Sequence, residues 1–559
     1  MPGPAETTPA ETTMALTGWG DPSRRQGVPP HAQRWLRRRL RLDPGLLLAA
    51  TRLAAAAARK PMQVPVSRLP AETLAALAEV VGVPNVQTDA GIRALHAGGK
   101  SYLDLLRRRA GDFADAPDAV VLPDTAEQVG ALLSTCAAHD VAVVPFGGGT
   151  SVVGGVEPLR GSHRAVITLD LRRLDRLLEV DPVSGLATFE PGVRGPVAER
   201  LLAAHGLTLG HLPQSFEYAT LGGFVATRSA GQASSGYGRI DELVVALTLQ
   251  TPAGPWRLGR GAASAAGPDL RALAVGSEGT LGVLTELTVR VRPRPAHRHY
   301  EGRLVGSFPA GLDLLRTLAQ GGQLPDVVRL SDPEETAVSL RMSAGGLTGQ
   351  AVRGYARARA GASPCLLILG WEGTASGIRA RRRAARAALA GTVPLGRAAG
   401  EQWRRGRFDG PYLRDDLMDL GVLVETLETS ASWSALPRVH QAIRAALDTA
   451  LPGAVVMTHV SHLYPHGASL YVTVLAAAEP AAPAAQWTAA KTAATDALVG
   501  AGATVTHHHA TGVDHLPWMR AEIGALGVDV LHAVKGVLDP TGILNPGKLI
   551  PPVQERGQP

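Results

Sequence analysis

Three loops rich in glycine, serine and threonine constrain the fold of this 559-residue chain more than any other feature. The first, PFGGGTSVVGG (145–155), continues directly from the apolar run VAVVPF, and the others are PQSFEYATLGGFVATRSAGQASSGYG (213–238) and GSEGTLGVLTE (276–286). Glycine lets the backbone approach a ligand closely, and successive exposed N–H groups form a nest for anionic oxygens. The first loop fits neither the Rossmann pattern nor the P-loop. A tight turn would explain any one loop, but three of them beside strands favour an extended dinucleotide lying across a sheet.

The segments around these loops predict a mixture of helices and strands. DAVVLP, the helix DTAEQVGALLSTCAAHD and the strand VAVVPF form a small βαβ unit, in which Thr125 and Gln128 have the spacing of a capping box. Strand-like segments dominate from there to about Pro295, and helices alternate with strands from about 300 to the end. This order of elements indicates an α+β protein.

Composition places the chain among globular proteins. Hydrophobic residues make up 45% and charged residues 19% of it. Cys136 and Cys365 are far apart in sequence, which argues against a disulfide framework and for a reducing compartment. No apolar run reaches the ~20 residues of a membrane-spanning helix. The N-terminus lacks the basic and apolar regions of a secretory signal, and no peroxisomal signal is evident, so the expected location is the cytoplasm.

The net charge of +7 would suit an anionic partner. Aromatic residues are only 4% of the chain and the basic residues are spread along it, so no nucleic-acid partner is expected. One segment, RWLRRRLRLDPGLLLAATRLAAAAAR (34–59), is basic and then apolar. It is either a solvated helix followed by a packed one, or a peripheral contact with a membrane surface whose anionic headgroups meet the arginines.

Three consecutive histidines, His507, His508 and His509, stand in the stretch TVTHHHATG. In a strand, His507 and His509 would face one way and His508 the other. Imidazole is a common metal ligand, but the sequence has no HExxH and no cysteine cluster beside the triplet, so no metal is expected. Surface histidines or the proton-transfer groups of an organic active site are the remaining interpretations.

The motifs P-GGGTS, S----T-GG--AT---G and EGTLGV follow one another in an order that resembles the vanillyl-alcohol-oxidase-type (PCMH-type) FAD flavoproteins. This resemblance implies a PCMH-type FAD-binding domain of two α/β subdomains at 116–296. It also implies an α+β cap and C-terminal catalytic domain at 297–556, with an antiparallel sheet and a C-terminal helical region. A disordered N-terminus (1–20) and an N-terminal helical region (21–115) would precede them.

The resemblance also implies FAD as the cofactor. No His or Cys is placed for covalent attachment, so the FAD is expected to be noncovalent. Gln214 stands where the family has Asp, which weakens one expected contact. The residues expected to bind FAD lie in the three loops and are Pro145, Phe146, Gly147, Gly148, Gly149, Thr150, Ser151, Gln214, Ser215, Phe216, Glu217, Tyr218, Ala219, Thr220, Thr227, Arg228, Ser229, Glu278, Gly279, Thr280, Leu281, Gly282, Val283 and Leu284.

Within these flavoproteins the chain most resembles the alkyldihydroxyacetonephosphate synthase (alkylglycerone-phosphate synthase) family. The motifs that carry this resemblance are GWGDPS (18–23), VVRLSD (327–332), YLRDDL (412–417), ETSASW (428–433), LYPHGASLYVTV (463–474) and THHHATG (506–512). By that match, Tyr471 is the catalytic tyrosine, and His507, His508 and His509 line the site beside the flavin. Arg414 matches a substrate-binding arginine and Arg329 a second required one. Tyr464 is the alternative to Tyr471, and a structural ion pair is the alternative role for Arg329.

The family's reaction exchanges the acyl group of acyl-dihydroxyacetone phosphate for a long-chain alcohol in ether lipid biosynthesis, and the family forms homodimers. The chain is therefore expected to be an FAD-dependent transferase acting on these two substrates. The stretch LDPTGILNPGKLI (538–550) instead resembles FAD-linked oxidases and dehydrogenases of D-lactate and glycolate. Oxidation of a 2-hydroxy acid or an alcohol is thus the alternative function. A flavin-binding protein without activity is a third interpretation, which the intact tyrosine and histidine set disfavours.

Overall fold

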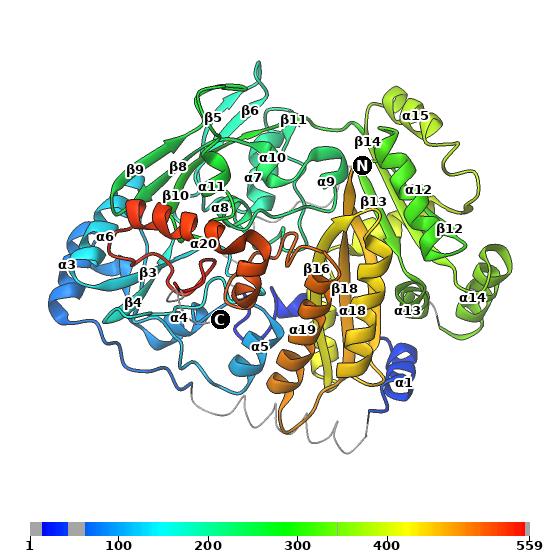
Figure 1. Ribbon diagram of the computed structural model, residues 1–559, viewed down its shortest axis with the longest axis horizontal. Coiled ribbons are helices and arrows are strands. Elements are labelled where there is room, and N and C mark those ends of the chain that lie inside the picture. Colours follow the sequence, from blue (N-terminus) through cyan, green and yellow to red (C-terminus); the bar gives the residue numbers. More distant parts are fainter. Residues whose placement is uncertain (1–13, 43–61, 344, 554–559) are drawn as a thin grey trace.

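The computed structural model describes residues 14–42, 62–343 and 345–553. In Figure 1 a first part, on the left, holds a four-stranded and a five-stranded sheet, and a second part, on the right, is built on a seven-stranded sheet. Within the described residues, no helix is both long and hydrophobic enough to cross a bilayer. This architecture confirms the predicted α+β class, with the antiparallel sheet following the two subdomains.

The first sheet has the strand order β1-β2-β4-β3. Its strands are β1 (Val86–Gln87), β2 (Ala119–Val121), β3 (Val141–Phe146) and β4 (Ala165–Asp170). Both β2 and β3 pair in parallel with β4, so the predicted βαβ unit forms with another strand inserted between its two strands. Its helix, α6 (Ala126–Ala138), begins where the Gln128 N–H donates to Thr125 Oγ1 (3.2 Å). Gln128 Oε1 accepts from Asp124 N–H (2.7 Å), not from Thr125, so only half of the predicted capping box is present.

The second sheet is antiparallel and has the order β5-β6-β10-β8-β9. Its strands are β5 (Leu177–Asp181), β6 (Leu186–Phe189), β8 (Val244–Thr251), β9 (Gly254–Leu258) and β10 (Val283–Arg290). Helices α7 (Gly195–Ala203) and α8 (Leu221–Ala226) bury Leu202 and Phe224 in one core with Leu287 of β10. The other helices and strands of this part are η1 (Pro22–Arg24), α3 (Ala71–Val81), η2 (Val83–Asn85), α4 (Ala90–Leu95), α5 (Tyr102–Arg109), β7 (Leu207–Thr208), α9 (Ser234–Tyr237), α10 (Ile240–Leu243), α11 (Arg271–Ala274) and β11 (Arg292–Pro293).

The seven-stranded sheet has the order β15-β12-β14-β13-β17-β18-β16. Its strands are β12 (His297–Val305), β13 (Val327–Ser331), β14 (Cys365–Gly373), β15 (Val393–Gly396), β16 (Val422–Ser432), β17 (Val455–Tyr464) and β18 (Gly467–Ala477). Neighbouring strands pair antiparallel. Along β18, Leu470 and Val472 belong to the hydrophobic core, whereas Tyr471 and Thr473 line a cavity on the opposite face. This two-residue period decides which side chains can reach a ligand.

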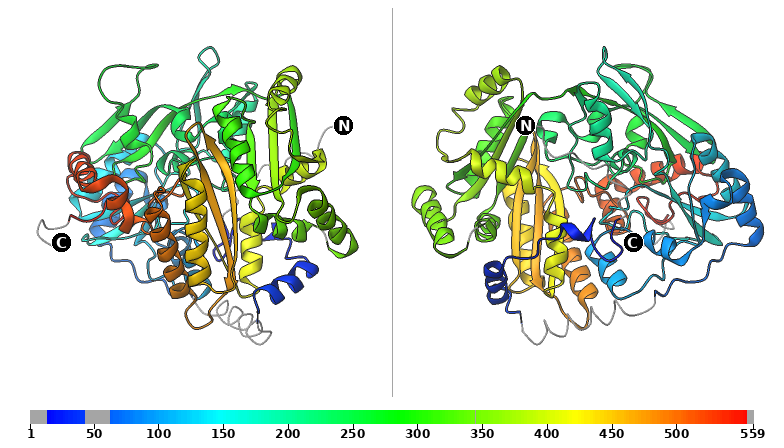
Figure 2. Two further views of the ribbon diagram at one scale, coloured as in Figure 1. Left: turned by 45° about the vertical axis from the view of Figure 1, so that its right-hand side comes forward. Right: turned by 180° about the vertical axis from the view of Figure 1, so that it is seen from behind.

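Helices pack on the core face of this sheet. α18 (Leu436–Ala450) and α19 (Pro483–Gly500) lie side by side against the long strands, as Figure 1 and the left view of Figure 2 show. They contribute Val439 and Trp487 to the same core as Leu470. The other helices of this part are α12 (Phe308–Gln320), α13 (Pro333–Ser343), α14 (Gly346–Ala360), α15 (Ala375–Ala384), α16 (Arg397–Gly406) and α17 (Gly410–Met418).

Two predictions concern the N-terminal part of the chain. Residues 14–20 were expected to be disordered, but Trp19 is 4% exposed and its N–H donates to Asp415 Oδ2 (2.6 Å), so that prediction is wrong for this stretch. Residues 1–13 and the apolar half of 34–59, from 43 on, lie outside the described residues. The basic half forms α1 (Pro30–Arg39).

The C-terminal segment returns to the first part of the molecule. α20 (Met519–Leu538) and η3 (Leu516–Trp518) precede a stretch that joins β3, where the Val143 N–H donates to Ile543 O (2.8 Å). Ile543 and Leu544 are fully buried in the core of the first sheet. The predicted domain of 297–556 is therefore not one spatial unit, because these apolar side chains complete the core of the other part. Figure 1 shows α20 in red over the first part.

Candidate active site

A cavity of about 430 Å³ lies between the glycine-rich loops and the seven-stranded sheet. This volume is typical of a ligand site. From the first part it is lined by Gly147–Val152, Val156, Pro213–Ser215, Ala219, Thr220, Gly223, Phe224, Thr227, Ser229, Ala230 and Gln232. The rest of its wall comes from Trp19, Leu36, Val327–Arg329, Val338, Met342, Trp403, Gly410, Pro411, Leu413, Arg414, Leu417, Val424–Thr426, Met457, His459, Ser461, His462, Tyr471, Thr473, Leu475, His508 and His509.

The first two glycine-rich loops cross with their backbones in contact. A Cβ at Gly148 would lie 2.1 Å from the carbonyl oxygen of Tyr218, and a Cβ at Gly147 would lie 2.3 Å from Thr220 Oγ1. Only glycine permits this approach. The crossing places Gly147–Ser151 and Ala219–Thr220 in one wall of the cavity, as the dinucleotide prediction requires.

The third loop lies behind the first and does not line this cavity. Leu281, Val283 and Leu284 are buried in hydrophobic cores. A Cβ at Gly279 would lie 2.8 Å from Pro145, and Glu278 accepts the N–H groups of Thr511 and Gly512 at 2.8 and 2.7 Å. The loop therefore supports the first loop and the segment after the histidine triplet. The sequence predicted direct FAD contact by this loop, but its residues do not line the cavity. They are Glu278, Gly279, Thr280, Leu281, Gly282, Val283 and Leu284.

Six more of the predicted FAD-binding residues point away from the cavity. Phe216 stacks on Phe408 (5.6 Å between ring centroids) and Tyr218 Oη hydrogen-bonds Tyr412 Oη (3.1 Å). Glu217 forms an ion pair with Arg24, and Arg228 forms one with Asp241. Pro145 packs against Gly279, and Phe146 packs against Gly149. The remaining predicted contacts, Gly147–Ser151, Gln214, Ser215, Ala219, Thr220, Thr227 and Ser229, line the cavity.

The residues present fit FAD. A crossing of glycine loops that any Cβ would block leaves backbone N–H groups and the hydroxyls of Thr150 and Ser151 available to a pyrophosphate. Gln232 Oε1 and Arg414 Nε are buried polar atoms in the cavity wall that have no hydrogen-bond partner among the described residues. Unpaired buried polar atoms are costly, and a bound polar ligand would pair with them.

Tyr471 faces the cavity from β18. Its ring stacks on His459 (4.9 Å between centroids) and meets His509 edge-on (5.6 Å). Burial raises the pKa of the Tyr471 hydroxyl to about 12, so the phenol holds its proton at neutral pH. Tyr464, the alternative catalytic tyrosine, does not line the cavity, and its Oη lies 2.6 Å from His507 Nε2.

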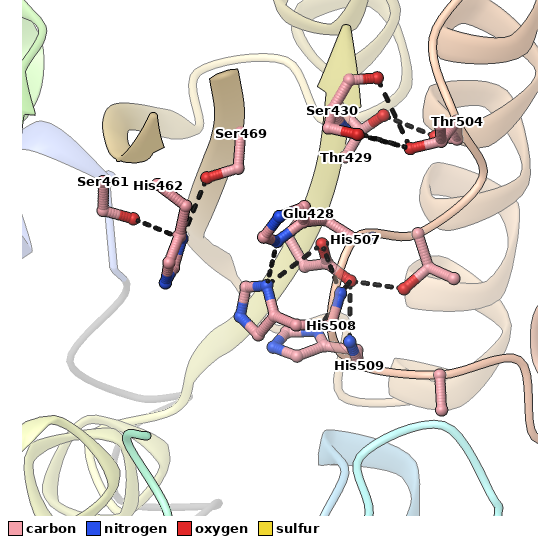
Figure 3. A network of polar contacts seen from close by, with 12 residues as sticks. Glu428, Thr429, Ser430, Ser461, His462, Ser469, Thr504, His507, His508 and His509 are labelled. Carbon is pink, nitrogen blue, oxygen red and sulfur yellow. Dashed lines mark hydrogen bonds and ion pairs between the residues drawn. The ribbon is translucent and has the colours of Figure 1, made fainter. Parts of the chain in front are cut away.

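The histidine triplet is not a strand. Residues 507–509 form a bend that curls around the carboxylate of Glu428 on β16, as Figure 3 shows. His508 and His509 both line the cavity and His507 does not, so the strand alternation predicted from the sequence is wrong. His507 Nδ1 and His508 Nδ1 lie 2.9 Å apart, within hydrogen-bond distance. Tyr464, His507 and His508 thus form a hydrogen-bonded chain that ends at the cavity wall.

The imidazoles of His462, His507 and His509 are neutral at physiological pH. Burial lowers the pKa of His509 to about 3 and holds the pKa of His507 and His462 well below the usual value. Neutral imidazole both accepts and donates hydrogen bonds, which suits it to pass protons between a phenol and a substrate.

Arg329 lines the cavity and belongs to a buried triad. Its guanidinium contacts Glu335 Oε1 (2.5 Å) and His459 Nε2 (3.0 Å), and His459 Nδ1 lies 3.0 Å from Glu335 Oε2. Because Arg329 can only donate, His459 Nε2 accepts and its Nδ1–H donates to Glu335. The ion pair that the sequence left open for Arg329 is present, and its substrate contact stays a prediction.

Arg414 on α17 reaches the same cavity. Its Nη1 donates to Lys100 O (2.5 Å). Glu425 is buried in the wall with a raised pKa, which follows chiefly from burial and is opposed by the charge of Arg414. The structure thus brings Arg414, Arg329, Tyr471, His508 and His509 together around one cavity.

The structure adds four functional candidates that were not predicted from the sequence: His459, His462, Glu425 and Glu428. All four lie on β16 and β17, and Glu425, His459 and His462 line the cavity. The alternation in VVMTHVSHLY indicates His459 but not His462, because a break in the β17–β18 register between Val460 and Leu463 puts His462 on the cavity side.

One cluster among the described residues has metal-compatible spacing. The ligand atoms of His462, His507 and His508 lie within 4.8 Å of one another. Their nitrogens already have partners, since His462 Nε2 contacts Gly231 O (3.1 Å) and His507 Nε2 contacts Tyr464 Oη. A metal would have to displace these contacts, and the absence of a metal stays a prediction.

The cofactor content of the purified protein tests this site. Acid precipitation should release yellow flavin into the supernatant if the FAD is bound noncovalently, as the sequence predicts, and elemental analysis should find no stoichiometric metal. Flavin retained in the pellet would contradict noncovalent binding. Colourless protein from flavin-replete cells that takes up no added FAD would contradict the site itself, and a metal whose removal by chelator abolishes activity would reassign the histidines.

Comparison with known proteins identifies the family. Residues 117–258 match the family model "FAD binding domain" and residues 294–549 match "FAD linked oxidases, C-terminal domain". The alkyldihydroxyacetonephosphate synthase of Dictyostelium discoideum is 34% identical over 83% of this chain and 78% of its own length. That of Trypanosoma brucei brucei is 33% identical over 86% and 81%. A solved alkyldihydroxyacetonephosphate synthase structure superposes with a TM-score of 0.80 at 28% identity, covering 96% of this chain and 99% of that one. The chain therefore belongs to the FAD-binding alkyldihydroxyacetonephosphate synthase family.

Proposed function

We propose that this protein exchanges the acyl group of acyl-dihydroxyacetone phosphate for a long-chain alcohol. The cavity wall, which combines polar groups with one apolar cluster, supports this proposal most directly. Arg329, Arg414 and His508 line it, and so do aliphatic and methionine side chains that pack together: Leu36, Val338, Met342, Leu413, Leu417, Val424, Met457 and Leu475. A small hydroxy acid would leave this apolar surface uncovered, whereas a long alkyl or acyl chain would bury it at ~0.8 kcal/mol per CH₂.

Arg414 suits the substrate's phosphate. Its side chain lines the cavity and is 11% exposed, and its Nε has no hydrogen-bond partner among the described residues. A planar guanidinium binds phosphate through paired hydrogen bonds that an ammonium cannot reproduce.

Tyr471 and the histidines suit the proton transfers of this exchange. The alcohol loses a proton as its oxygen bonds to the three-carbon unit, and the acyl group leaves as a carboxylate that can take a proton up. Tyr471 and His508 stack with their ring centroids 6.0 Å apart, and His508 is linked onward to His507. This chain of groups can hold a proton between the two steps and return to its starting state. Bound FAD supplies the electron-sink chemistry.

The test of this function supplies both substrates without any electron acceptor. Equal amounts of ether product and free fatty acid should form, identified by mass spectrometry. Tyr471→Phe should lower the rate ~10²–10⁴-fold while FAD content is kept, because it removes a proton-transfer group. Tyr355→Phe, on the exposed face of α14, is the matched control. Product that forms only with a dye acceptor and a hydroxy acid would establish the oxidoreductase alternative, and near-normal turnover of Tyr471→Phe would move the role to Tyr464.

A second variant tests the phosphate contact. Arg414→Lys should raise the KM for acyl-dihydroxyacetone phosphate and leave the FAD content near that of the wild type, since the charge remains but the planar fork is lost. The KM for the alcohol should change little. Unchanged KM values together with lost flavin would mean that Arg414 supports the fold and not the phosphate.

We also propose that α1 and α14 contact an anionic membrane surface. Arg34, Arg37 and Arg38 are exposed on α1, and α14 exposes Leu347 (83%) and contains no acidic residue. The two regions adjoin, since the Trp35 ring lies 5.2 Å from the guanidinium of Arg341 on α13, which precedes α14. Leu36 of α1 belongs to the apolar cluster of the cavity wall, so a lipid chain could pass from a bilayer into the cavity. The dimer and the cytoplasmic location stay predictions.

Vesicle sedimentation tests this contact. The protein should pellet with vesicles that contain phosphatidylglycerol more than with neutral vesicles, and added salt should weaken the binding. Replacing Arg34, Arg37 and Arg38 by Glu should abolish the difference. The matched control replaces the exposed Arg379, Arg383 and Arg386 of the α15 region in the same way. Equal effects of the two triple substitutions, or no binding to either vesicle, would contradict the proposal.

A further inference from the structure

Glu428 is a buried carboxylate around which the histidine triplet curls. It lies on β16 opposite Tyr471 of β18 and is 4% exposed. The main-chain N–H groups of His507, His508 and His509 all donate to it, at 2.6, 3.1 and 2.9 Å, and the hydroxyl of Thr506 donates to Oε1. Figure 3 shows these contacts converging on the one side chain.

Three successive N–H groups can point at one acceptor only if the backbone curls into a nest. An extended strand would send alternate N–H groups in opposite directions. The curl around Glu428 therefore replaces strand geometry, and it brings the neighbouring rings of His508 and His509 to the cavity together. Three adjacent histidines can thus serve one site.

The Glu428 side chain is charged. Burial would raise its pKa, but attraction to and hydrogen bonding with His508, followed by the other two histidines, lower the pKa well below its usual range. The three backbone N–H donors act in the same direction. Among the described residues, the imidazole nitrogens nearest its oxygens include His508 Nδ1 (3.4 Å) and His509 Nδ1 (4.0 Å).

We infer that Glu428 is a positioning residue that holds His508 and His509 against Tyr471. It does not line the cavity, so it acts through the triplet and not on the substrate. Glu425, three residues earlier on the same strand, does line the cavity and accepts N–H groups of Tyr102 and Thr426 instead. The catalytic part of this inference rests on the proposed function, whereas the structural part does not.

The experiment compares Glu428→Gln, Glu428→Asp and the matched control Glu199→Gln. Glu199 also accepts two backbone N–H groups, of Leu209 and Gly210, and a threonine hydroxyl, but outside the cavity wall. Gln offers one acceptor oxygen and turns an NH₂ group toward the donors. Hydrogen exchange of a peptide spanning 505–511 should therefore speed up in Glu428→Gln. The kcat should fall ~10²-fold, as for a misplaced catalytic group, with KM values and FAD content retained.

Glu428→Asp keeps the charge and should recover part of both the protection and kcat, and Glu199→Gln should match the wild type. Unchanged exchange at 505–511 in Glu428→Gln, or faster exchange with normal kcat, would overturn the inference. The inference would also be overturned if Glu428→Gln and Glu428→Asp lowered kcat equally and both lost FAD, because Glu428 would then be a general structural residue. If the wild type shows no synthase activity, the proposed function fails separately. The exchange data and the visible circular dichroism of the bound flavin, which should change in Glu428→Gln alone, then decide the inference.

Discussion

The active site depends on the two-residue alternation of the antiparallel strands β16, β17 and β18. In β18, Leu470 and Val472 pack under the helices while Tyr471 and Thr473 line the cavity. The same face presents His459 of β17, and the glycine-rich loops of the other part close over it. A shift of one residue in register would exchange the core side chains for the catalytic ones, so the packing that stabilises the sheet also fixes the orientation of the site.

Buried carboxylates join the separate pieces of this site. Glu428 holds the histidine triplet, Glu335 orients both Arg329 and His459, and Glu278 accepts the N–H groups of Thr511 and Gly512. A buried charge is tolerated only when hydrogen bonds satisfy it. Each carboxylate therefore specifies one arrangement of segments that lie far apart in sequence. The neutral imidazoles and the protonated Tyr471 work within this fixed polar frame.

Local sequence patterns were sufficient to predict the elements but not their long-range partners. The glycine runs and the strand containing Tyr471 carry their own signals, and both face the cavity. The bend at the histidine triplet could not be predicted from the sequence, because Glu428, 79 residues away, sets its conformation and no local pattern indicates that contact. In GSEGTLGVLTE the glycines suggested ligand contact. Leu281 and Val283 are instead buried in the core, which their apolar side chains indicate. Likewise, no local pattern predicts that Ile543 and Leu544 return to the first sheet, where its core buries them.

The proposed reaction of this flavoprotein is an exchange with no net oxidation. The most direct measurement follows the visible spectrum of the bound flavin under anaerobic conditions, with acyl-dihydroxyacetone phosphate and a long-chain alcohol present and no acceptor. Many turnovers per flavin are expected while the absorption stays that of oxidised flavin at steady state. Bleaching of the flavin, with product formation stopping at one equivalent, would contradict an exchange without net oxidation.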